Sequence, residues 1–297
     1  IAVDGSAFQV PNNTYSYYGG QKSQGEPQAM AEVCMLYDVI NETIIKADID
    51  KYIANEREQA LKMIKQLDHQ EQNNIFVFDR GFPSRKLLAE IGTKSKYLFR
   101  VSKQFMSAVN NATEADQIVQ ISDENGEAMQ LRVINILLST GETEKLLTNI
   151  FDFSPDFFEK MYALRWGIEC NYKSLKSILQ IENFTSGYPI LIEQDFYATV
   201  LIANFLSISI NETNHDLSEK LKDKDYKNGR KINYKAAFSI LKPIFIQALC
   251  ESNPEIAAAL LEEAQLEILN FTSVVRPNRS FQRKKKHSAA KFNFSTK

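Results

Sequence analysis

The sequence is poor in the residues that build redox or imidazole-based sites. It has three cysteines and three histidines among 297 residues. The cysteines Cys34, Cys170 and Cys250 are odd in number and lack the paired spacing of metal ligands, and the histidines are scattered through polar segments. A disulfide framework, a zinc site and a Ser-His-Asp triad therefore have little support, and carboxylates must carry any chemistry. Buried thiols in a reducing cytoplasm are the expected setting.

Long hydrophobic runs are also missing. No run of about 18 apolar residues occurs, so the sequence predicts no membrane-spanning helix. The most apolar stretch, "FYATVLIANFLSISI" at residues 196–210, is flanked by acids and predicts a buried helix. The chain opens without Met on the strand-like "IAVDGS", and we expect the natural protein to carry residues before it.

The net charge of −2 conceals an uneven distribution. Residues 276–297, "RPNRSFQRKKKHSAAKFNFSTK", hold eight Lys or Arg and no acid, which leaves 27 bases against 37 acids in the remainder. A basic tail on an acidic body indicates a polyanionic partner. A solvated, disordered tail accounts for the tail alone equally well.

The first part of the chain alternates between strand-like and helix-like segments. Strands are expected at residues 1–10, with a turn at Asp4-Gly5-Ser6, as a pair within 29–49, before Asp79, and at 97–102. Charged amphipathic segments predict helices at 55–67 and 84–92. This order predicts an α/β fold, a ribonuclease-H-like mixed sheet with flanking helices.

The pattern changes after residue 103. Three strands with turns at Asn125-Gly126 and Thr140-Gly141 predict a β-rich insertion before a helical C-terminal part. Helices are expected at about 155–180, 190–210, 234–251 and 255–271. The expected divisions are the first part of the core at 1–103, the insertion at 104–150, the helical part at 151–275 and the basic tail at 276–297.

Two acids follow short apolar runs. Asp4 comes after Ile1-Ala2-Val3, and Asp79 comes after residues 75–78, each with a glycine within two residues. A sharp turn there would leave the carboxylate at the edge of the sheet. Ordinary turn chemistry is the alternative, and for either acid alone it is the better explanation.

A third acid, Glu169, lies in a polar stripe. At about 100° per residue, the side chains of Tyr162, Arg165, Glu169, Lys173 and Lys176 share an arc of about 80° on the helix that follows Ser154-Pro155. A packing side is expected from Met161, Leu164, Ile168, Leu175 and Leu179. A solvated helix face with i,i+4 ion pairs is the alternative.

The three acids together predict a metal site. If the first and fourth strands are neighbours, Asp4 and Asp79 converge, and the helix can place Glu169 opposite them. Three close carboxylates repel one another unless a divalent cation is present. Oxygen ligands of this kind suit Mg²⁺ or Mn²⁺, and two ions can serve phosphodiester cleavage.

Four stretches match the motifs of one known family in the same order. They are "VDGSAFQVPN", "FVFDRGFPS", the spacing of Tyr162, Arg165, Glu169 and Lys176, and "RPNRSFQRKKK". In these the chain resembles the DDE transposases of bacterial insertion sequences, specifically the insertion-sequence-four family with its Y-R-E-K signature. The resemblance covers nearly all 297 residues, the β insertion included.

The resemblance implies a DNA recombinase. It implies nicking at transposon ends by water attack, then joining of the freed 3′-hydroxyl to target DNA through a two-metal displacement. Asp4, Asp79 and Glu169 are implied as catalytic residues and as ligands of two Mg²⁺ or Mn²⁺ ions. The implied partners are double-stranded DNA and a second copy of the chain, and no membrane is implied. The implied location is the cytoplasm of a bacterium, in association with the nucleoid.

Further residues are expected to bind DNA. The resemblance assigns phosphate contacts to Tyr162, Arg165 and Lys176, and geometry adds Lys173 on the same stripe and Arg80 beside Asp79. The basic tail is expected to contribute Arg283, Lys284, Lys285 and Lys286.

The sequence also departs from the family pattern. Members that open their ends through a DNA hairpin hold a flipped base with an aromatic residue of the insertion, but residues 104–150 contain only Phe105 near their start and no Trp. The resemblance also implies an N-terminal region that helps recognise transposon ends, which would precede Ile1. Two alternatives remain: an inactive or domesticated remnant that binds DNA, and a stand-alone ribonuclease-H-like nuclease.

Overall fold

The structure is a computed structural model. It describes residues 1–22, 27–67, 74–102, 104–138, 141–222 and 228–275. Contacts divide the chain into two units, the first made of residues 1–174 and 184–196 and the second of 175–183 and 197–297. Among the described residues, none of the helices offers a stretch long and apolar enough to span a bilayer.

Eleven strands and nine α-helices are described, together with one short 3-10 helix at Asn12–Thr14. The strands are β1 (Ala2–Gln9), β2 (Gly20–Gln21), β3 (Gln28–Asp38), β4 (Thr43–Lys51), β5 (Ile75–Phe78), β6 (Lys96–Val101), β7 (Asp116–Ser122), β8 (Ala128–Leu137), β9 (Thr143–Thr148), β10 (Arg230–Ile232) and β11 (Thr272–Val274). The helices are α1 (Tyr15–Tyr18), α2 (Glu56–Lys65), α3 (Arg85–Gly92), α4 (Ser107–Asn110), α5 (Pro155–Leu164), α6 (Trp166–Ser177), α7 (Pro189–Leu221), α8 (Tyr234–Cys250) and α9 (Pro254–Ile268).

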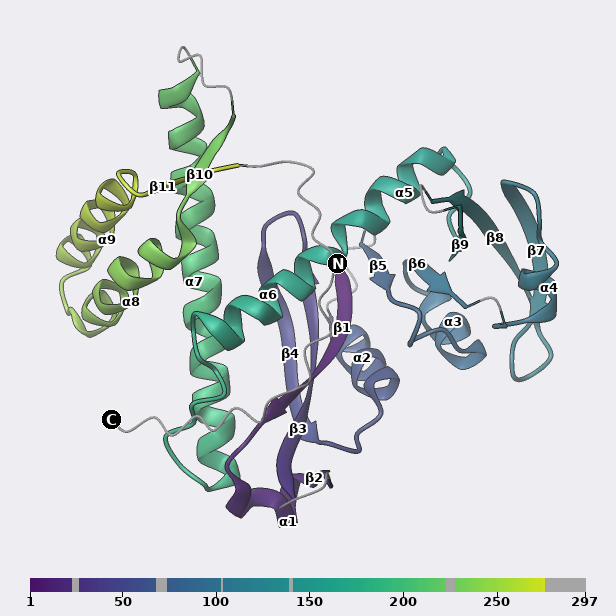
Figure 1. Cartoon of the computed structure of the whole chain (residues 1–297), viewed down its shortest axis with the longest axis horizontal. Coiled ribbons are helices and arrows are strands. Elements are labelled where there is room, and N and C mark those ends of the chain that lie inside the picture. Colours follow the sequence, from purple (N-terminus) through teal and green to yellow (C-terminus); the bar gives the residue numbers. More distant parts are fainter. Residues whose placement is uncertain (23–26, 68–73, 103, 139–140, 223–227, 276–297) are drawn as a thin grey trace. The chain divides into compact units, whose positions relative to one another are not determined.

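The first unit is built on one mixed sheet of nine strands (Figure 1). The strand order is β2-β3-β1-β5-β6-β9-β8-β7, and β4 pairs with β3. Strand β1 is antiparallel to β3 and parallel to β5, and β5 is parallel to β6. The prediction of a mixed α/β sheet is thus confirmed.

Strand β1 does not break where the sequence predicts a turn. It pairs with β3 from Ala2 to Gln9, with Asp4 opposite Met35 and Gly5 opposite Cys34. The prediction of a turn at Asp4-Gly5-Ser6 was wrong because the continuous ladder satisfies the backbone of these residues. Gly5 serves close packing instead, since a Cβ there would lie 2.6 Å from Cδ of Glu56.

The three strands expected between residues 104 and 150 extend the same sheet. Strand β9 pairs antiparallel with β6, and β8 and β7 follow as a meander. Gly126 and Gly141 take positive φ at the two connections, as turn residues between antiparallel strands should. Thr140, expected in the second turn, lies outside the described residues.

Helices cover both faces of this sheet. Leu61 and Ile64 of α2 and Leu88 of α3 join a core with side chains of β1, β3, β5 and β6. On the opposite face, Phe158 of α5 packs with Val77 of β5 and other strand residues. Asn55 and Ser84 cap α2 and α3, with side-chain oxygens that accept backbone N–H bonds.

The single helix predicted at 155–180 is two helices. Helix α5 begins with Pro155 after Ser154, as the sequence indicates, but it ends at Leu164, and α6 begins at Trp166. Arg165 lies at the junction. Of the predicted packing side, Ile168 and Leu175 are fully buried, whereas Leu164 is 47% exposed, because the break turns it out of the expected face.

The second unit is helical. Leu206 and Leu217 of α7 share a core with Leu241 of α8 and Ile268 of α9. Helix α7 continues to Leu221, beyond the end expected at about residue 210, because Leu217 is buried in that core. The strands β10 and β11, which the sequence did not reveal, form an antiparallel ribbon.

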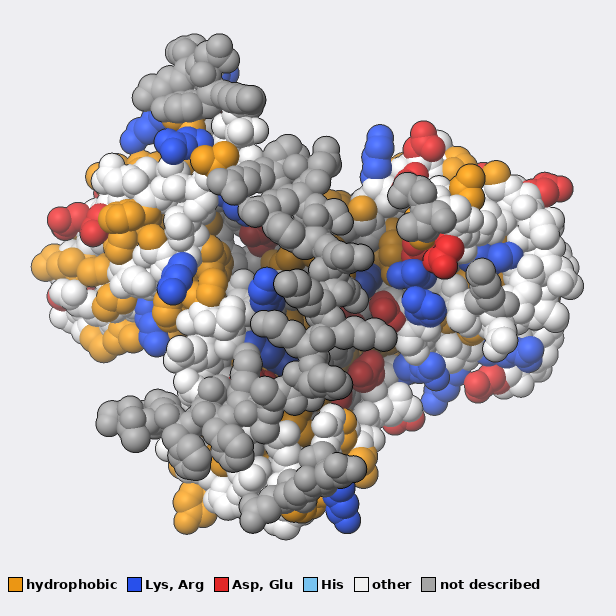
Figure 2. Space-filling model, in the orientation of Figure 1, with side chains coloured by type: hydrophobic (Ala, Val, Ile, Leu, Met, Phe, Trp, Pro, Cys, Tyr) orange, Lys and Arg blue, Asp and Glu red, His pale blue; other side chains and the backbone are white. Residues whose placement is uncertain are grey.

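Figure 2 shows hydrophobic side chains gathered on the surface of this unit, where Ile246, Leu249 and Leu266 are exposed.

Candidate active site

Asp4 and Asp79 are neighbours in the register of two parallel strands. Val3 of β1 pairs with Phe78 of β5, so the next residue of each chain is an acid. Adjacent strands lie about 4.8 Å apart, which brings the two acids to neighbouring positions. The condition for convergence that the sequence analysis set, that the first and fourth predicted strands be neighbours, is met.

The two acids differ in their backbone setting. Asp4 lies inside β1, whereas Asp79 follows the last residue of β5. The Asp79 carboxylate accepts a hydrogen bond from the Gly81 N–H, with 2.5 Å between Oδ1 and N. The Phe82 N–H donates to the Asp79 carbonyl at 3.3 Å, which closes a tight turn. Asp79 thus combines the strand end and the turn that the sequence predicted for it.

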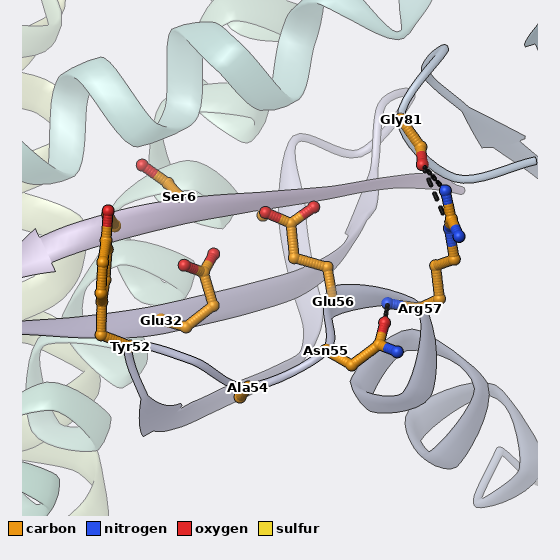
Figure 3. A pocket seen from close by; sticks show the side chains of 10 residues that line it. Ser6, Glu32, Tyr52, Ala54, Asn55, Glu56, Arg57 and Gly81 are labelled. Atoms are coloured by element: carbon orange, nitrogen blue, oxygen red, sulfur yellow. Dashed lines mark hydrogen bonds between the residues drawn. The ribbon is translucent and has the colours of Figure 1, made fainter. Parts of the chain in front are cut away.

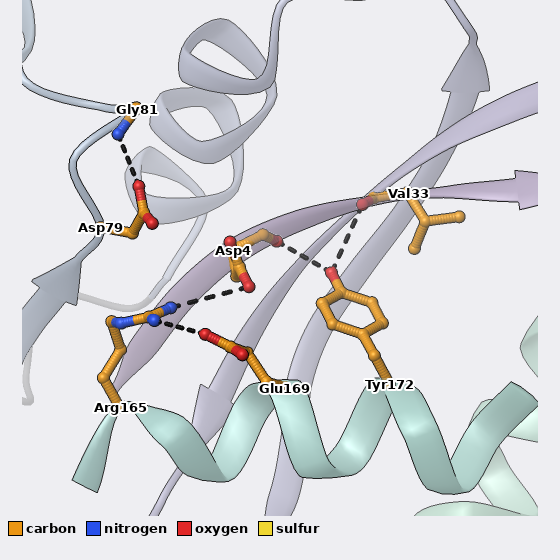
Figure 4. Close-up of polar contacts among 7 residues, drawn as sticks. All are labelled: Asp4, Val33, Asp79, Gly81, Arg165, Glu169 and Tyr172. Atoms are coloured by element: carbon orange, nitrogen blue, oxygen red, sulfur yellow. Dashed lines mark hydrogen bonds and ion pairs between the residues drawn. The ribbon is translucent and has the colours of Figure 1, made fainter. Parts of the chain in front are cut away.

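Glu169 reaches the same place from helix α6. Its carboxylate accepts a hydrogen bond from Arg165, with 2.6 Å between Oε1 and Nη2. Nη1 of Arg165 lies 3.7 Å from Oδ2 of Asp4, a long ion pair. Figure 4 shows the guanidinium pointing between the two carboxylates, with Asp79 on the other side of Asp4. Arg165 therefore pairs with two of the three acids, by a hydrogen bond to Glu169 and a longer ion pair to Asp4.

Arg165 is buried, unlike a side chain on a solvated stripe. Its side chain is 8% exposed, and burial alone would lower its pKa. Tyr162, Glu169 and Asp4 outweigh that effect and raise the pKa, so the guanidinium stays charged. Among the described residues, Nε and Nη1 find no hydrogen-bond acceptor. Two nitrogen donors of Arg165 thus lie at the centre of the site without a hydrogen-bond acceptor.

The Asp4 carboxyl is held in a poorly solvated place. Burial raises its pKa to about 7, an effect that Arg165 opposes and that Asp79 and Glu169 reinforce. The backbone N–H of Gly5 also opposes the rise. Burial outweighs the Arg165 charge because the ion pair is long and has no hydrogen bond between the two groups.

Tyr172, which the sequence analysis did not single out, connects α6 to the strand of Asp4. Its hydroxyl donates to the Asp4 carbonyl at 2.8 Å and lies 3.3 Å from the Val33 carbonyl. Its ring meets the Phe8 ring edge-on at 6.0 Å. Burial raises the pKa of Tyr172 well above its usual value. Its position three residues after Glu169, on the same helix face, was the available signal.

Tyr162 lies in α5, before the helix break. Its ring is 5.8 Å from the Arg165 guanidinium, and its hydroxyl is buried with no hydrogen-bond partner among the described residues. Burial raises its pKa. The structure thus brings Tyr162 to Arg165 and not to the surface.

The remaining predicted DNA contacts are dispersed. Arg80, next to Asp79, and Lys173 of α6 are exposed. Lys176 belongs to the second unit, where its Nζ lies 3.6 Å from Oε1 of Glu182. The four tail residues lie outside the described residues: Arg283, Lys284, Lys285 and Lys286.

The donor set suits a hard divalent cation, but the arrangement is not that of a closed metal site. Asp4, Asp79 and Glu169 offer carboxylate oxygens, the ligands that Mg²⁺ and Mn²⁺ prefer. Within the described part of the chain, however, no three His, Cys, Asp or Glu side chains lie close enough together to hold an ion. The Arg165 guanidinium pairs with two of these acids. The chemistry of the residues fits a metal, and Arg165 competes for the same oxygens.

An open pocket of about 600 Å³ adjoins the site on the α2 side of β1 (Figure 3). Its lining includes Gly5, Glu32, Glu56, Arg57 and Gly81. Figure 3 shows Arg57 reaching the carbonyl of Gly81, which lies within the turn that begins at Asp79. The pocket therefore borders the backbone that carries two of the acids.

The family follows from a comparison with protein-family models. Residues 1–205 match the model described as the transposase DDE domain, a region that contains all three acids and both helices α5 and α6. The chain belongs to the DDE transposase family. A comparison with curated proteins finds no match.

A comparison with solved structures finds a similar protein. The chain is similar to the piggyBac transposase in its synaptic complex with hairpin DNA, at 11% identity and a TM-score of 0.47. The similarity covers 91% of this chain and 52% of the piggyBac chain. The chain thus spans about half the length of that protein.

Proposed function

We propose that this DDE transposase cleaves phosphodiester bonds at transposon ends and transfers the freed 3′-hydroxyl to target DNA. The observation that carries the proposal is the convergence of Asp4 and Asp79, on adjacent strand positions, with Glu169 across from Asp4. All three lie in the region that matches the family model. Asp4, Asp79 and Glu169 are then the catalytic acids.

The strand order supports a ribonuclease-H-like core. Three antiparallel strands, β4, β3 and β1, are followed by the parallel strands β5 and β6. In sheets of this kind, sites form where strands end and helices cross them. The proposed divisions are the core at 1–103, the strand insertion at 104–150, the helices at 151–275 and the basic tail at 276–297.

Asp4, Asp79 and Glu169 are proposed to hold Mg²⁺ or Mn²⁺, two ions when DNA is bound. When bound, such ions activate the attacking hydroxyl and stabilise the leaving oxygen of a phosphodiester. The proposal requires Arg165 to release Asp4 and Glu169, and its unused donors suit a DNA phosphate in the fork geometry typical of arginine. Tyr162 moves with it, since its ring lies against the guanidinium.

Exposed cations are proposed to hold the DNA backbone. Arg80 and Lys173 adjoin two of the acids along the chain and the helix, and Lys176 and the basic tail add positive charge. Phosphate contacts of this type position the duplex without reading its sequence. The Y-R-E-K spacing supports assignment to the insertion-sequence-four family. Joining two transposon ends calls for a homodimer in the active complex, and a bacterial cytoplasmic, nucleoid-associated setting is proposed from the family resemblance.

A joining assay tests the proposal. The substrate is a duplex with a pre-cut 3′ end taken from the DNA that flanks the coding sequence, incubated with plasmid target in Mg²⁺, Mn²⁺ or Ca²⁺. We expect joined product from the full-length protein in Mg²⁺ or Mn²⁺ and none from Glu169→Ala. Glu159→Ala, at an exposed position of α5, is the matched control and should join normally.

The same assay separates the alternatives. Nicked plasmid without joined product would indicate a stand-alone nuclease. DNA binding without cleavage by either protein would indicate an inactive remnant, in which the acids form a structural ion-pair cluster around Arg165.

A further inference from the structure

We propose that Arg57 is a positioning residue for the catalytic acid Asp79, acting through the backbone of Gly81. The inference rests on the proposed function, because it assigns Arg57 a part in holding a metal ligand. No motif of the sequence marks Arg57, which lies on α2, more than twenty positions before the Asp79 turn.

The first turn of α2 fixes the position of Arg57. The side chain of Asn55 caps the helix, and its Oδ1 accepts the Arg57 N–H at 3.1 Å (Figure 3). The neighbouring Glu56 lies so close to β1 that a Cβ at Gly5 would be 2.6 Å from its Cδ. The start of α2 therefore packs beside Asp4, and the Arg57 side chain starts from a defined place.

The Arg57 guanidinium donates two hydrogen bonds to the Gly81 carbonyl. Nε and Nη2 of Arg57 lie 3.1 Å and 2.7 Å from the Gly81 oxygen. Two donors on one charged, planar group fix the direction of the acceptor as well as its distance. A lysine can offer a single ammonium to this carbonyl, without the fork.

Gly81 connects the Arg57 guanidinium to the Asp79 carboxylate. Its N–H donates to Oδ1 of Asp79 at 2.5 Å, as Figure 4 shows. The Gly81 carbonyl and N–H are joined through one Cα, so the two Arg57 bonds restrict the rotation of this glycine, and without them we expect the N–H and the Asp79 carboxylate to lose their fixed orientation. Such outer contacts orient metal-binding carboxylates and cost roughly 10–100-fold in metal affinity or activity when removed.

Arg57 is itself exposed, so its substitution should leave the fold intact. Its loss should weaken the affinity for a divalent cation and leave the rate at saturating metal nearly unchanged, because Asp79 remains present. This pattern distinguishes a positioning residue from the catalytic acids, because a variant that lacks one of the acids should stay inactive at every metal concentration.

The test follows Mn²⁺ binding to the full-length protein by electron paramagnetic resonance, together with nicking of supercoiled plasmid over the same Mn²⁺ titration. Arg57→Gln should raise the half-saturating Mn²⁺ concentration roughly 10–100-fold, with a plateau rate close to that of the wild type. Arg57→Lys should recover part of the shift. Arg85→Gln, which removes an exposed arginine at the start of α3, is the matched control and should overlay the wild type.

Two results would overturn the inference while the proposed function stands. One is an Arg57→Gln titration that overlays the wild type. The other is an equal loss of rate at every Mn²⁺ concentration together with a lower melting temperature, which marks a structural role. A wild-type protein that nicks at no Mn²⁺ concentration would refute the proposed function, and the positioning role with it.

Discussion

Asp4 and Asp79 occupy neighbouring positions of parallel strands, yet the protein holds them in opposite ways. Asp4 lies inside a continuous strand, beneath a helix that contacts its backbone through the buried Tyr172 hydroxyl. Asp79 lies in a turn whose backbone is held by the exposed Arg57. One acid is fixed by packing and the other by hydrogen bonds at the surface.

This difference indicates how the site can be both stable and adjustable. Removing a contact on the Asp4 side should cost folding free energy, because the groups involved are buried. Removing a contact on the Asp79 side should cost metal affinity with little change in stability. The predictions below probe the Asp4 side and run from the largest expected effect to the smallest.

The largest effect on stability is expected from Arg165→Gln. In EDTA, the free energy of unfolding should fall by roughly 1–3 kcal/mol, because Asp4 and Glu169 lose their buried countercharge. In Mg²⁺ the deficit should shrink, since the cation then takes the freed oxygens. Urea denaturation with and without Mg²⁺ measures both values, with Arg85→Gln as control. A deficit that Mg²⁺ leaves unchanged would count against competition between Arg165 and the metal.

A pH dependence follows from the raised pKa of Asp4, which lies at about 7 in the folded protein. Between about pH 4 and pH 7 the folded state binds a proton that the unfolded chain has released. The metal-free protein should therefore lose stability as pH rises through this window, by up to about 1.4 kcal/mol per pH unit. Urea denaturation in EDTA across the window measures the slope, and Asp4→Asn should reduce it. An unchanged slope in that variant would assign the effect to another group.

Tyr172→Phe should have the smallest effect of the three. The variant keeps the ring against Phe8 and loses the hydroxyl bond to the Asp4 carbonyl, at a cost of about 1 kcal/mol. Urea denaturation measures the loss, and Tyr17→Phe, at an exposed tyrosine, is the control. Equal stability of Tyr172→Phe and wild type would show that the hydroxyl does not fasten α6 to β1.

Sequence reasoning reached the parts of the site that depend on local pattern. Short apolar runs followed by acids indicated Asp4 and Asp79, and the prediction that the two acids converge if their strands are neighbours matches the pairing of β1 with β5. The motif spacing gave Glu169. Each of these signals lies within a few residues of the chain.

The contacts between segments distant in the sequence could not be predicted. Arg57 binds a backbone carbonyl, which every residue possesses, so no side-chain pattern marks its partner. The i,i+4 spacing indicated the pair of Arg165 with Glu169, but the burial of Arg165 and its approach to Asp4 depend on contacts with a distant strand. Tyr172 is polar at one atom only, and its buried partner is again a carbonyl.

The central claim is that Asp4, Asp79 and Glu169 hold divalent cations on DNA. The most direct measurement is Mn²⁺ binding, followed by electron paramagnetic resonance, to the full-length protein with a pre-cut end duplex. We predict two ions per active site in the wild type and weaker or missing binding in Asp4→Asn, Asp79→Asn and Glu169→Gln. Mn²⁺ binding that is the same in all four proteins would contradict the account.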